Sequence, residues 1–281
     1  MDGDQDGCRP VPGAVTSPAS SSTPAQRLDV VVAHLDGLLR TAELPDYGGA
    51  LNGLQIANSG HIQSVAVAVD FSRAAIDGAV ATGAQLLVVH HGMFWAGVQP
   101  ITGPTYERLR RLIAHDLAVY ASHLPLDLHP TLGNNVLLAH RLGLTPTDGF
   151  ARYKTVDVGV SGESDVETAE LASRVAAFAV ARGGTLRTAG VTPGRRTRRW
   201  GLCTGAGASS ETIQEAVARG LDTLVVGEGP HHTAVEAAER GLAILYAGHY
   251  ATETLGVEAL GAELERQFAL PWTFVGEPTG L

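Results

Sequence analysis

Short apolar runs alternate with amphipathic stretches along most of the chain. Runs with the length of buried strands recur at residues 64–70, 85–89, 117–120, 200–203, 222–226 and 242–245. Between them, apolar residues repeat at helical spacing over 73–82, 106–115, 209–219 and 232–240. Strands that alternate with helices are typical of parallel βαβ units. The pattern therefore predicts an α/β protein with mixed, mostly parallel sheets covered by helices.

The rest of the pattern adds elements around these two blocks. We expect helices that begin near residue 28 and cover 134–142, 166–181 and 251–268. Further strands are expected at 154–160, 185–189 and 272–275. Residues 1–25 are rich in Gly, Pro, Ser and Thr and hold almost nothing to bury, which predicts a disordered leader.

The two alternating blocks also resemble each other in sequence. Residues 79–89 match residues 216–226, and residues 117–123 match residues 242–249 with one extra residue. The simplest account is a duplicated α/β unit. We therefore expect two related lobes, the first formed by residues 26–125 and 245–281 and the second by residues 126–244.

Histidines mark equivalent places in the two blocks. Each block has an adjacent pair after a strand and a histidine four residues before an acidic residue, and these positions hold six of the eleven histidines: His90, His91, His123, His231, His232 and His249. In open α/β sheets, ligands bind beyond the carboxyl ends of strands. Neighbouring residues on a strand point in different directions, so one pair can serve two metal ions, or one ion and a substrate.

The acidic partners support a metal site at these strand ends. His249 and Glu253 are four residues apart at a predicted helix start, which puts them on one face, and His123 and Asp127 repeat that spacing. Imidazole and carboxylate without thiolate favour Zn, Fe or Mn. One carboxylate can bridge two cations about 3.5–4 Å apart. A single His-His pair would be read as ordinary loop residues, but the registered repetition favours a metal cluster.

Composition excludes several classes of protein. The chain has 20 Lys and Arg against 29 Asp and Glu, and this net charge of −9 argues against a general nucleic-acid binder. Two cysteines, Cys8 and Cys203, cannot form a disulfide framework and fit a reducing cytoplasm. No apolar run reaches the ~18 residues of a membrane span, and the acidic N-terminus is unlike a signal peptide.

Three weaker signals have simpler interpretations. The arginines within residues 195–199 could hold phosphate, but a solvated hairpin tip is favoured. Residues 205–210 could seat a phosphate at a helix start, but a glycine turn with a serine N-cap is favoured. Trp95 is predicted to lie in a core or a subunit contact rather than to stack on a substrate.

Several segments resemble the Ngg-one-interacting factor three-like family, the dinuclear-metal toroid proteins also called GTP cyclohydrolase I type 2 homologues. They run from about residue 28 to the C-terminus and comprise 52–55, 87–95, 123–127 with 133–135, 203–209, 227–232, 247–253 and 278–280. The chain departs at Met93 and Phe94, where a proline and an aliphatic residue are common. Residues 161–199 are too few for the extra domain of larger members.

The resemblance implies a two-domain α/β fold with two divalent metal ions (Zn, Fe or Mn) in the cleft between the lobes. It also implies a ring-shaped homohexamer whose sites face an internal cavity. The family's ligands fall on His90, His91, Asp127, His249 and Glu253, with Glu253 as the bridge. Cleft-lining positions fall on His123, His231 and His232, taken as catalytic groups that move protons, and on Glu228, which would support a ligating histidine.

The resemblance favours a metal-dependent hydrolase, in which a bridging hydroxide attacks a nucleotide or related small molecule. The family name suggests the imidazole ring of GTP, but the residues do not select guanine, and a phosphoesterase or amidase would use the same groups. The alternative is a non-catalytic metal-binding scaffold or regulatory protein. A nucleic-acid-binding ring would depend on residues 195–199 alone and is disfavoured by the net charge.

Overall fold

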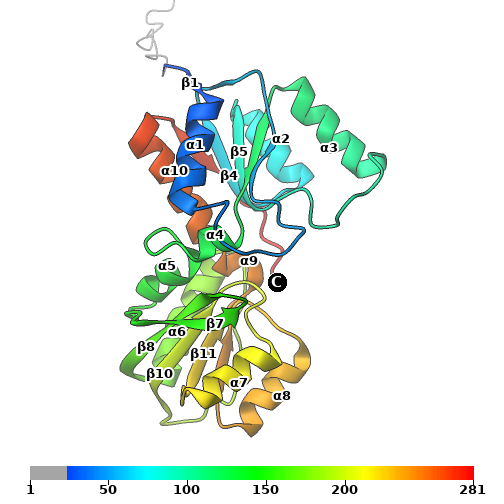
Figure 1. Cartoon of the computed structure of the whole chain (residues 1–281). Coiled ribbons are helices and arrows are strands. Elements are labelled where there is room, and N and C mark those ends of the chain that lie inside the picture. The colour runs from blue at the N-terminus through cyan, green and yellow to red at the C-terminus, as the bar shows by residue number, and fades with distance from the viewer. Residues whose placement is uncertain (1–23) are drawn as a thin grey trace, which may run out of the picture.

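The computed structural model describes residues 24–281, and it folds into two lobes, each built around one sheet (Figure 1). The predicted leader lies almost wholly outside the described residues. Short helices and the C-terminus lie where the lobes meet (Figure 1). The α/β class with mixed sheets covered by helices is confirmed.

The first lobe holds a five-stranded sheet in the order β13-β4-β5-β6-β2. Its bounds are β13 (Trp272–Phe274), β4 (Val65–Asp70), β5 (Leu86–His91), β6 (Ala118–Ala121) and β2 (Gly53–Ile56). All neighbours are parallel except β2, which is antiparallel to β6. A two-stranded ribbon of β1 (Gln26–Arg27) and β3 (His61–Ile62) stands beside it.

Helices cover both faces of this first sheet. One face packs on α1 (Leu28–Leu39) and α10 (Thr254–Phe268), and the other on α2 (Arg73–Ala81) and α3 (Gly103–Ala114). Alternate residues of β4 serve the two cores: Val67 faces α1 and α10, whereas Ala66 and Ala68 face α2. Burial on both faces explains the continuous apolar runs in the sequence.

The second lobe holds a six-stranded sheet in the order β7-β8-β10-β11-β12-β9. The strands are β7 (Asp148–Tyr153), β8 (Val156–Glu167), β10 (Arg196–Cys203), β11 (Thr223–Val226), β12 (Ala243–Tyr246) and β9 (Arg187–Ala189). One face is covered by α5 (Asn134–Arg141) and α6 (Thr168–Ala181), the other by α7 (Ser210–Ala218) and α8 (His231–Glu239).

The repeat seen in the sequence appears as two equivalent parallel triplets. Strands β4, β5 and β6 pair in parallel in one lobe, as β10, β11 and β12 do in the other. Each third strand leads into a one-turn helix, α4 (Leu124–Asp127) or α9 (His249–Thr252). The duplication therefore places two equivalent strand ends near the junction of the lobes.

Three sequence expectations differ from the structure. The lobe boundary at residues 244/245 falls inside β12, which pairs along its whole length with β11 and so belongs to the second lobe. The helix expected at 251–268 is two helices, α9 and α10, because the backbone leaves helical geometry at Glu253 (φ −107°, ψ 6°).

The third difference concerns residues 195–199, expected as an exposed turn. The turn ends at Arg195, and strand β10 begins at Arg196, because Arg196 pairs with Glu167 at the end of β8. Arg195 donates to the carbonyl oxygens of Asp222 and Gly241, and Arg196 pairs with Asp165.

The helices within residues 24–281 include none with the length and apolar character of a membrane span.

Helix α2 begins with a side-chain cap that offers a stability test. Ser72 Oγ accepts a hydrogen bond from the backbone N–H of Ala75 at 2.9 Å. Replacing Ser72 with alanine leaves that N–H unpaired, so we expect unfolding to become easier by about 1 kcal/mol. Urea denaturation measures it. Ser173→Ala, in the middle of α6, is the matched control, since its hydroxyl only bonds back to the Ala169 carbonyl. Equal midpoints for the two variants would contradict the prediction.

Candidate metal centre

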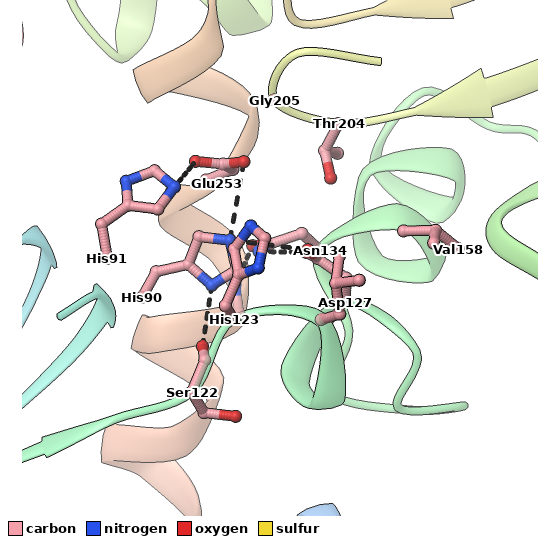
Figure 2. A network of polar contacts seen from close by, with 12 residues as sticks. His90, His91, Ser122, His123, Asp127, Asn134, Val158, Thr204, Gly205 and Glu253 are labelled. Atoms are coloured by element: carbon pink, nitrogen blue, oxygen red, sulfur yellow. Dashed lines mark hydrogen bonds and ion pairs between the residues drawn. The ribbon is translucent and has the colours of Figure 1, made fainter. Parts of the chain in front are cut away.

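Four histidines and two carboxylates converge where the lobes meet. Figure 2 shows His90, His91 and His123 with Asp127 and Glu253. His90 and His91 end β5, and His123 follows the neighbouring strand β6. Because β5 and β6 are parallel, their carboxyl ends bring these side chains to one edge of the first sheet. Asp127 ends α4, His249 begins α9, and Glu253 occupies the break between α9 and α10.

Glu253 lies at the centre of the cluster and is buried. Its Oε1 is 3.5 Å from His90 Nε2, and its Oε2 is 3.3 Å from His91 Nε2 and 3.1 Å from His249 Nε2. Histidines from both halves of the duplication therefore contact one carboxylate. The neighbouring imidazoles of His90 and His91 face the same group although they are adjacent on a strand.

Each of the four histidines has its Nδ1 occupied by an acceptor. His90 Nδ1 contacts the Ser122 carbonyl oxygen at 2.9 Å. The other three pair with carboxylates at 2.8 Å: His91 with Asp70, His123 with Asp46, and His249 with Glu228. When each ring is neutral with its proton on Nδ1, Nδ1–H donates to these oxygens and Nε2 presents its lone pair to the cluster. This is how proteins orient metal-ligating histidines.

Asp127 is held in a similar way. Its Oδ1 accepts from Asn134 Nδ2 at 2.8 Å, and its Oδ2 lies 3.5 Å from His90 Nε2. Asn134 is itself fixed, because its Oδ1 accepts from the backbone N–H of Gly256 at 2.7 Å. The side chain of Asn134 therefore ties α5, α4 and α10 together around the carboxylate.

The electrostatics of the cluster favour added positive charge. Burial opposes a charge on His90, but the Asp127 and Glu253 carboxylates outweigh it and raise its pKa to about 10. Burial also opposes a charge on His249, and Glu253 and Glu228 raise its pKa to about 9. The pKa of Glu253 lies well below its usual range because His90 and His91 outweigh its burial.

Two buried atoms of the cluster lack hydrogen-bond partners among the described residues. They are His90 Nε2, which lies 3.5 Å from Glu253 Oε1, and Glu253 Oε2, which lies 3.3 Å from His91 Nε2. A buried polar atom without a partner is costly unless a cation or water satisfies it. Two groups have ligand atoms close enough to share an ion: His90 with His91 and His123, and His91 with His249 and Glu253. The residues present therefore fit divalent cations.

The cluster opens into a cavity of about 960 Å³ lined by both lobes. The first lobe contributes Tyr47, Trp95 and His123, and the second contributes Tyr153 and the turn at residues 204–209. Cys203 also lines it, and burial raises the pKa of its thiol to about 12. Among residues 24–281, the groups whose ligand atoms lie close enough to share an ion offer imidazole nitrogen and carboxylate oxygen.

The structure brings together six of the nine site residues named from the sequence and places a seventh beside them. His90, His91, His123, Asp127, His249 and Glu253 form the cluster, and Glu228 contacts His249 from behind. His231 and His232 are not brought to it: they are exposed in the first turn of α8 and do not line the cavity. His231 lies five residues beyond the end of β11, where α8 begins, whereas His90 and His91 still belong to strand β5.

Three contributors to the site were not found from the sequence. Asp70 ends β4, so the strand-end rule that selected His90 could have found it. Asp46 lies in the loop before β2, where no pattern marks it, yet it fixes His123. Trp95 was expected in a core or contact; it is 39% exposed and its ring stands edge-on to His123 with centroids 4.8 Å apart.

At residues 205–210 the favoured serine cap is present, because Ser209 Oγ accepts from Thr212 N–H.

Comparison with known proteins decides the family. The family model described as Duf34/NIF3 (NGG1p interacting factor 3) matches residues 27–278. The chain belongs to the DUF34/NIF3 family. The resemblance inferred from the histidine motifs is thereby confirmed.

Relatives in the DUF34/NIF3 family match nearly the whole chain. A Deinococcus radiodurans protein named GTP cyclohydrolase 1 type 2 homolog is 40% identical over 262 residues, covering 90% of this chain and 94% of its own. A Halobacterium salinarum protein of the same name is 39% identical, with 89% and 98% covered. The solved structure of TTHA1606 from Thermus thermophilus has a TM-score of 0.78 at 34% identity, over 91% of this chain and 100% of that chain.

Proposed function

We propose that this chain is a dinuclear metal-dependent hydrolase that acts on a nucleotide or a related small molecule. The observation that carries the proposal is the shared carboxylate of Glu253, which three histidine Nε2 atoms approach within 3.5 Å while each Nδ1 is occupied by another acceptor. That arrangement suits a bridge between two cations. The names of the relatives support the hydrolase class.

Each half of the cluster would hold one cation. His90 and Asp127 would serve one, His91 and His249 the other, and Glu253 would contact both. Two divalent cations there would supply charge that polarises an electrophilic carbon or phosphorus and lowers the pKa of a water molecule. Zinc, iron and manganese all suit this ligand set. The ring-shaped hexamer and the cytoplasmic location remain predictions.

His123 is the residue that we assign to proton transfer. Asp46 fixes its ring through Nδ1, and the backbone N–H of His123 donates to Asn52 at 2.7 Å. Its ring lies 4.9 Å from that of His90 and contributes to the cavity wall, so it can reach both the cluster and a bound ligand. A neutral imidazole in this position can take a proton and return it to a leaving group.

Turnover by the metal-loaded protein tests the proposal. Protein purified without chelator or His-tag is loaded with Zn²⁺, Mn²⁺ or Fe²⁺ and incubated with GTP and a panel of phosphoesters. We expect hydrolysis of at least one compound, reduced to background by chelation and in Glu253→Ala. Glu239→Ala, which removes an exposed carboxylate from α8, is the matched control and should keep full activity. Equal rates for wild type and Glu253→Ala on every compound would leave the scaffold alternative instead.

Metal affinity should depend on pH. Without a cation, protons are retained on His90 and His249 up to pKa values of about 10 and about 9, so binding must displace them below that range. We expect Mn²⁺ affinity to rise by about tenfold per pH unit for each displaced proton between about pH 6 and about pH 8. Calorimetry in buffers of different ionisation enthalpy would count the released protons. An affinity that is flat over this range would contradict the assigned ligands.

A further inference from the structure

An aromatic surface lines the cavity beside the metal cluster. It consists of Tyr47, Trp95 and Tyr153, and we call these three residues the aromatic subsite. Tyr47 is 52% exposed and Trp95 39% exposed, which is high for large apolar side chains. The Tyr47 ring lies 4.7 Å from that of Tyr153 and 6.3 Å from that of Trp95, measured between centroids. The subsite thus spans both lobes.

The subsite adjoins the residues assigned to chemistry. The Trp95 ring stands edge-on to His123 at 4.8 Å and to His91 at 5.8 Å. Tyr47 follows Asp46, whose carboxylate orients His123, and Lys154 Nζ donates to the Asp46 carbonyl oxygen at 3.0 Å. A ring held against Trp95 or Tyr47 would therefore lie next to the imidazoles of the cluster.

The polar ends of these rings have no partners among the residues that the structure describes. Among residues 24–281, no hydrogen bond involves the hydroxyl of Tyr47 or Tyr153 or the Nε1 of Trp95, so all three can bond to a ligand. Glu211 also lines the cavity and can accept from ring N–H groups, whereas Glu215 already accepts from Arg219 and from the backbone N–H of Arg152. Arg152 is the single Arg or Lys side chain on the described wall, and its guanidinium already donates to Asp157 at 3.0 Å.

We infer that the aromatic subsite binds a planar nitrogen heterocycle and so selects the substrate of this enzyme. Flat aromatic faces attract flat rings by offset stacking, whereas an aliphatic ligand would need no such wall. With the Arg152 guanidinium paired to Asp157, a phosphate group would bind at the metal cluster, and the aromatic subsite is left to bind the ring. The statement that the subsite selects a substrate rests on the proposed function, whereas the binding of a heterocycle does not depend on it.

Equilibrium dialysis of the metal-loaded full chain with guanosine, adenosine and ribose 5-phosphate tests the subsite. We expect both nucleosides to bind saturably. Tyr47→Leu and Tyr153→Leu keep apolar volume but lose the ring, and each should weaken nucleoside binding by about tenfold or more. The Phe variants should retain it. Tyr106→Leu, which removes an exposed tyrosine from α3 outside the cavity, is the control and should bind like wild type.

Fluorescence gives a second readout that a merely structural role would not change. Guanosine should quench Trp95, and Trp95→Phe should lose that quenching while its affinity by dialysis stays within about threefold, since a ring remains. Failure of both nucleosides to bind would overturn the inference, as would affinities that the Leu variants leave unchanged. So would an equal loss of guanosine and ribose 5-phosphate binding in the Leu variants, because the subsite contacts the ring alone.

The same variants separate this inference from the proposed function. Glu253→Ala removes a cluster carboxylate but leaves the aromatic subsite intact. If nucleosides bind through the tyrosines while no compound is hydrolysed, the hydrolase proposal fails and the subsite stands. If phosphoesters are hydrolysed but no nucleoside binds, the subsite fails and the hydrolase stands.

Discussion

Glu253→Ala is expected to bring the metal content of the purified protein from two equivalents to one or fewer. Glu253 is the carboxylate that the Nε2 atoms of His90, His91 and His249 share, so its removal takes a ligand from both proposed ions. Elemental analysis after purification without chelator measures the loss.

The fold should survive this change. Glu253 lines the cavity between the lobes, so water from that cavity can fill the space that the truncated side chain leaves. Circular dichroism would verify it, and Glu239→Ala serves as the control that should keep both equivalents. Glu253→Gln gives a sharper test, since it keeps the shape of the side chain and removes only the charge. Two full equivalents in both Glu253 variants would sink the bridging assignment.

Gly205→Ala is expected to disrupt the same site from the second lobe. Gly205 has φ +61°, and a Cβ added to it would overlap Glu253 Oε1. The glycine cannot move away easily, because its N–H donates to Thr252 Oγ1 at 3.0 Å and its carbonyl accepts from Glu228 N–H at 2.7 Å. The Glu253 carboxylate must therefore shift, and we expect at least about a hundredfold loss of metal affinity.

Gly83→Ala separates backbone strain from this collision. Gly83 has a similar φ of +72° but nothing within 4 Å of an added Cβ. Both alanines should cost about 1 kcal/mol or more of stability through the left-handed backbone. Metal titration by calorimetry should find normal binding in Gly83→Ala only. If Gly205→Ala binds metal as tightly as Gly83→Ala, Glu253 does not need its observed position.

The duplication and the fold class follow from local patterns. Continuous apolar runs such as 85–89 predict strands buried on both faces, and β5 is indeed covered by helices on both sides. The strand-end rule then selects His90, His91 and His123, because the carboxyl end of a parallel strand is determined by chain direction alone. Motif spacing selects His249 and Glu253, since four residues make one helical turn.

The same rules fail where long-range packing decides. Asp46 is an unmarked loop residue that becomes essential to His123 through a contact across 77 positions of sequence. The His231-His232 pair fits the repeat in letters, yet α8 begins at His231 and turns both side chains to solvent. The break at Glu253 is likewise invisible in the helical periodicity that runs across it.

The sequence by itself therefore determined the two α/β units, their strand ends and most of the polar residues placed there, because these depend on periodicity and chain direction. Only the tertiary structure decided which of those residues meet. It brings His249, at the start of α9, beside His91 at the end of β5, so that Glu253 is approached by His90 and His249 together. It also decides that Tyr47 and Tyr153, 106 residues apart, form one wall of the cavity. Such contacts depend on how two lobes pack, which no local pattern encodes.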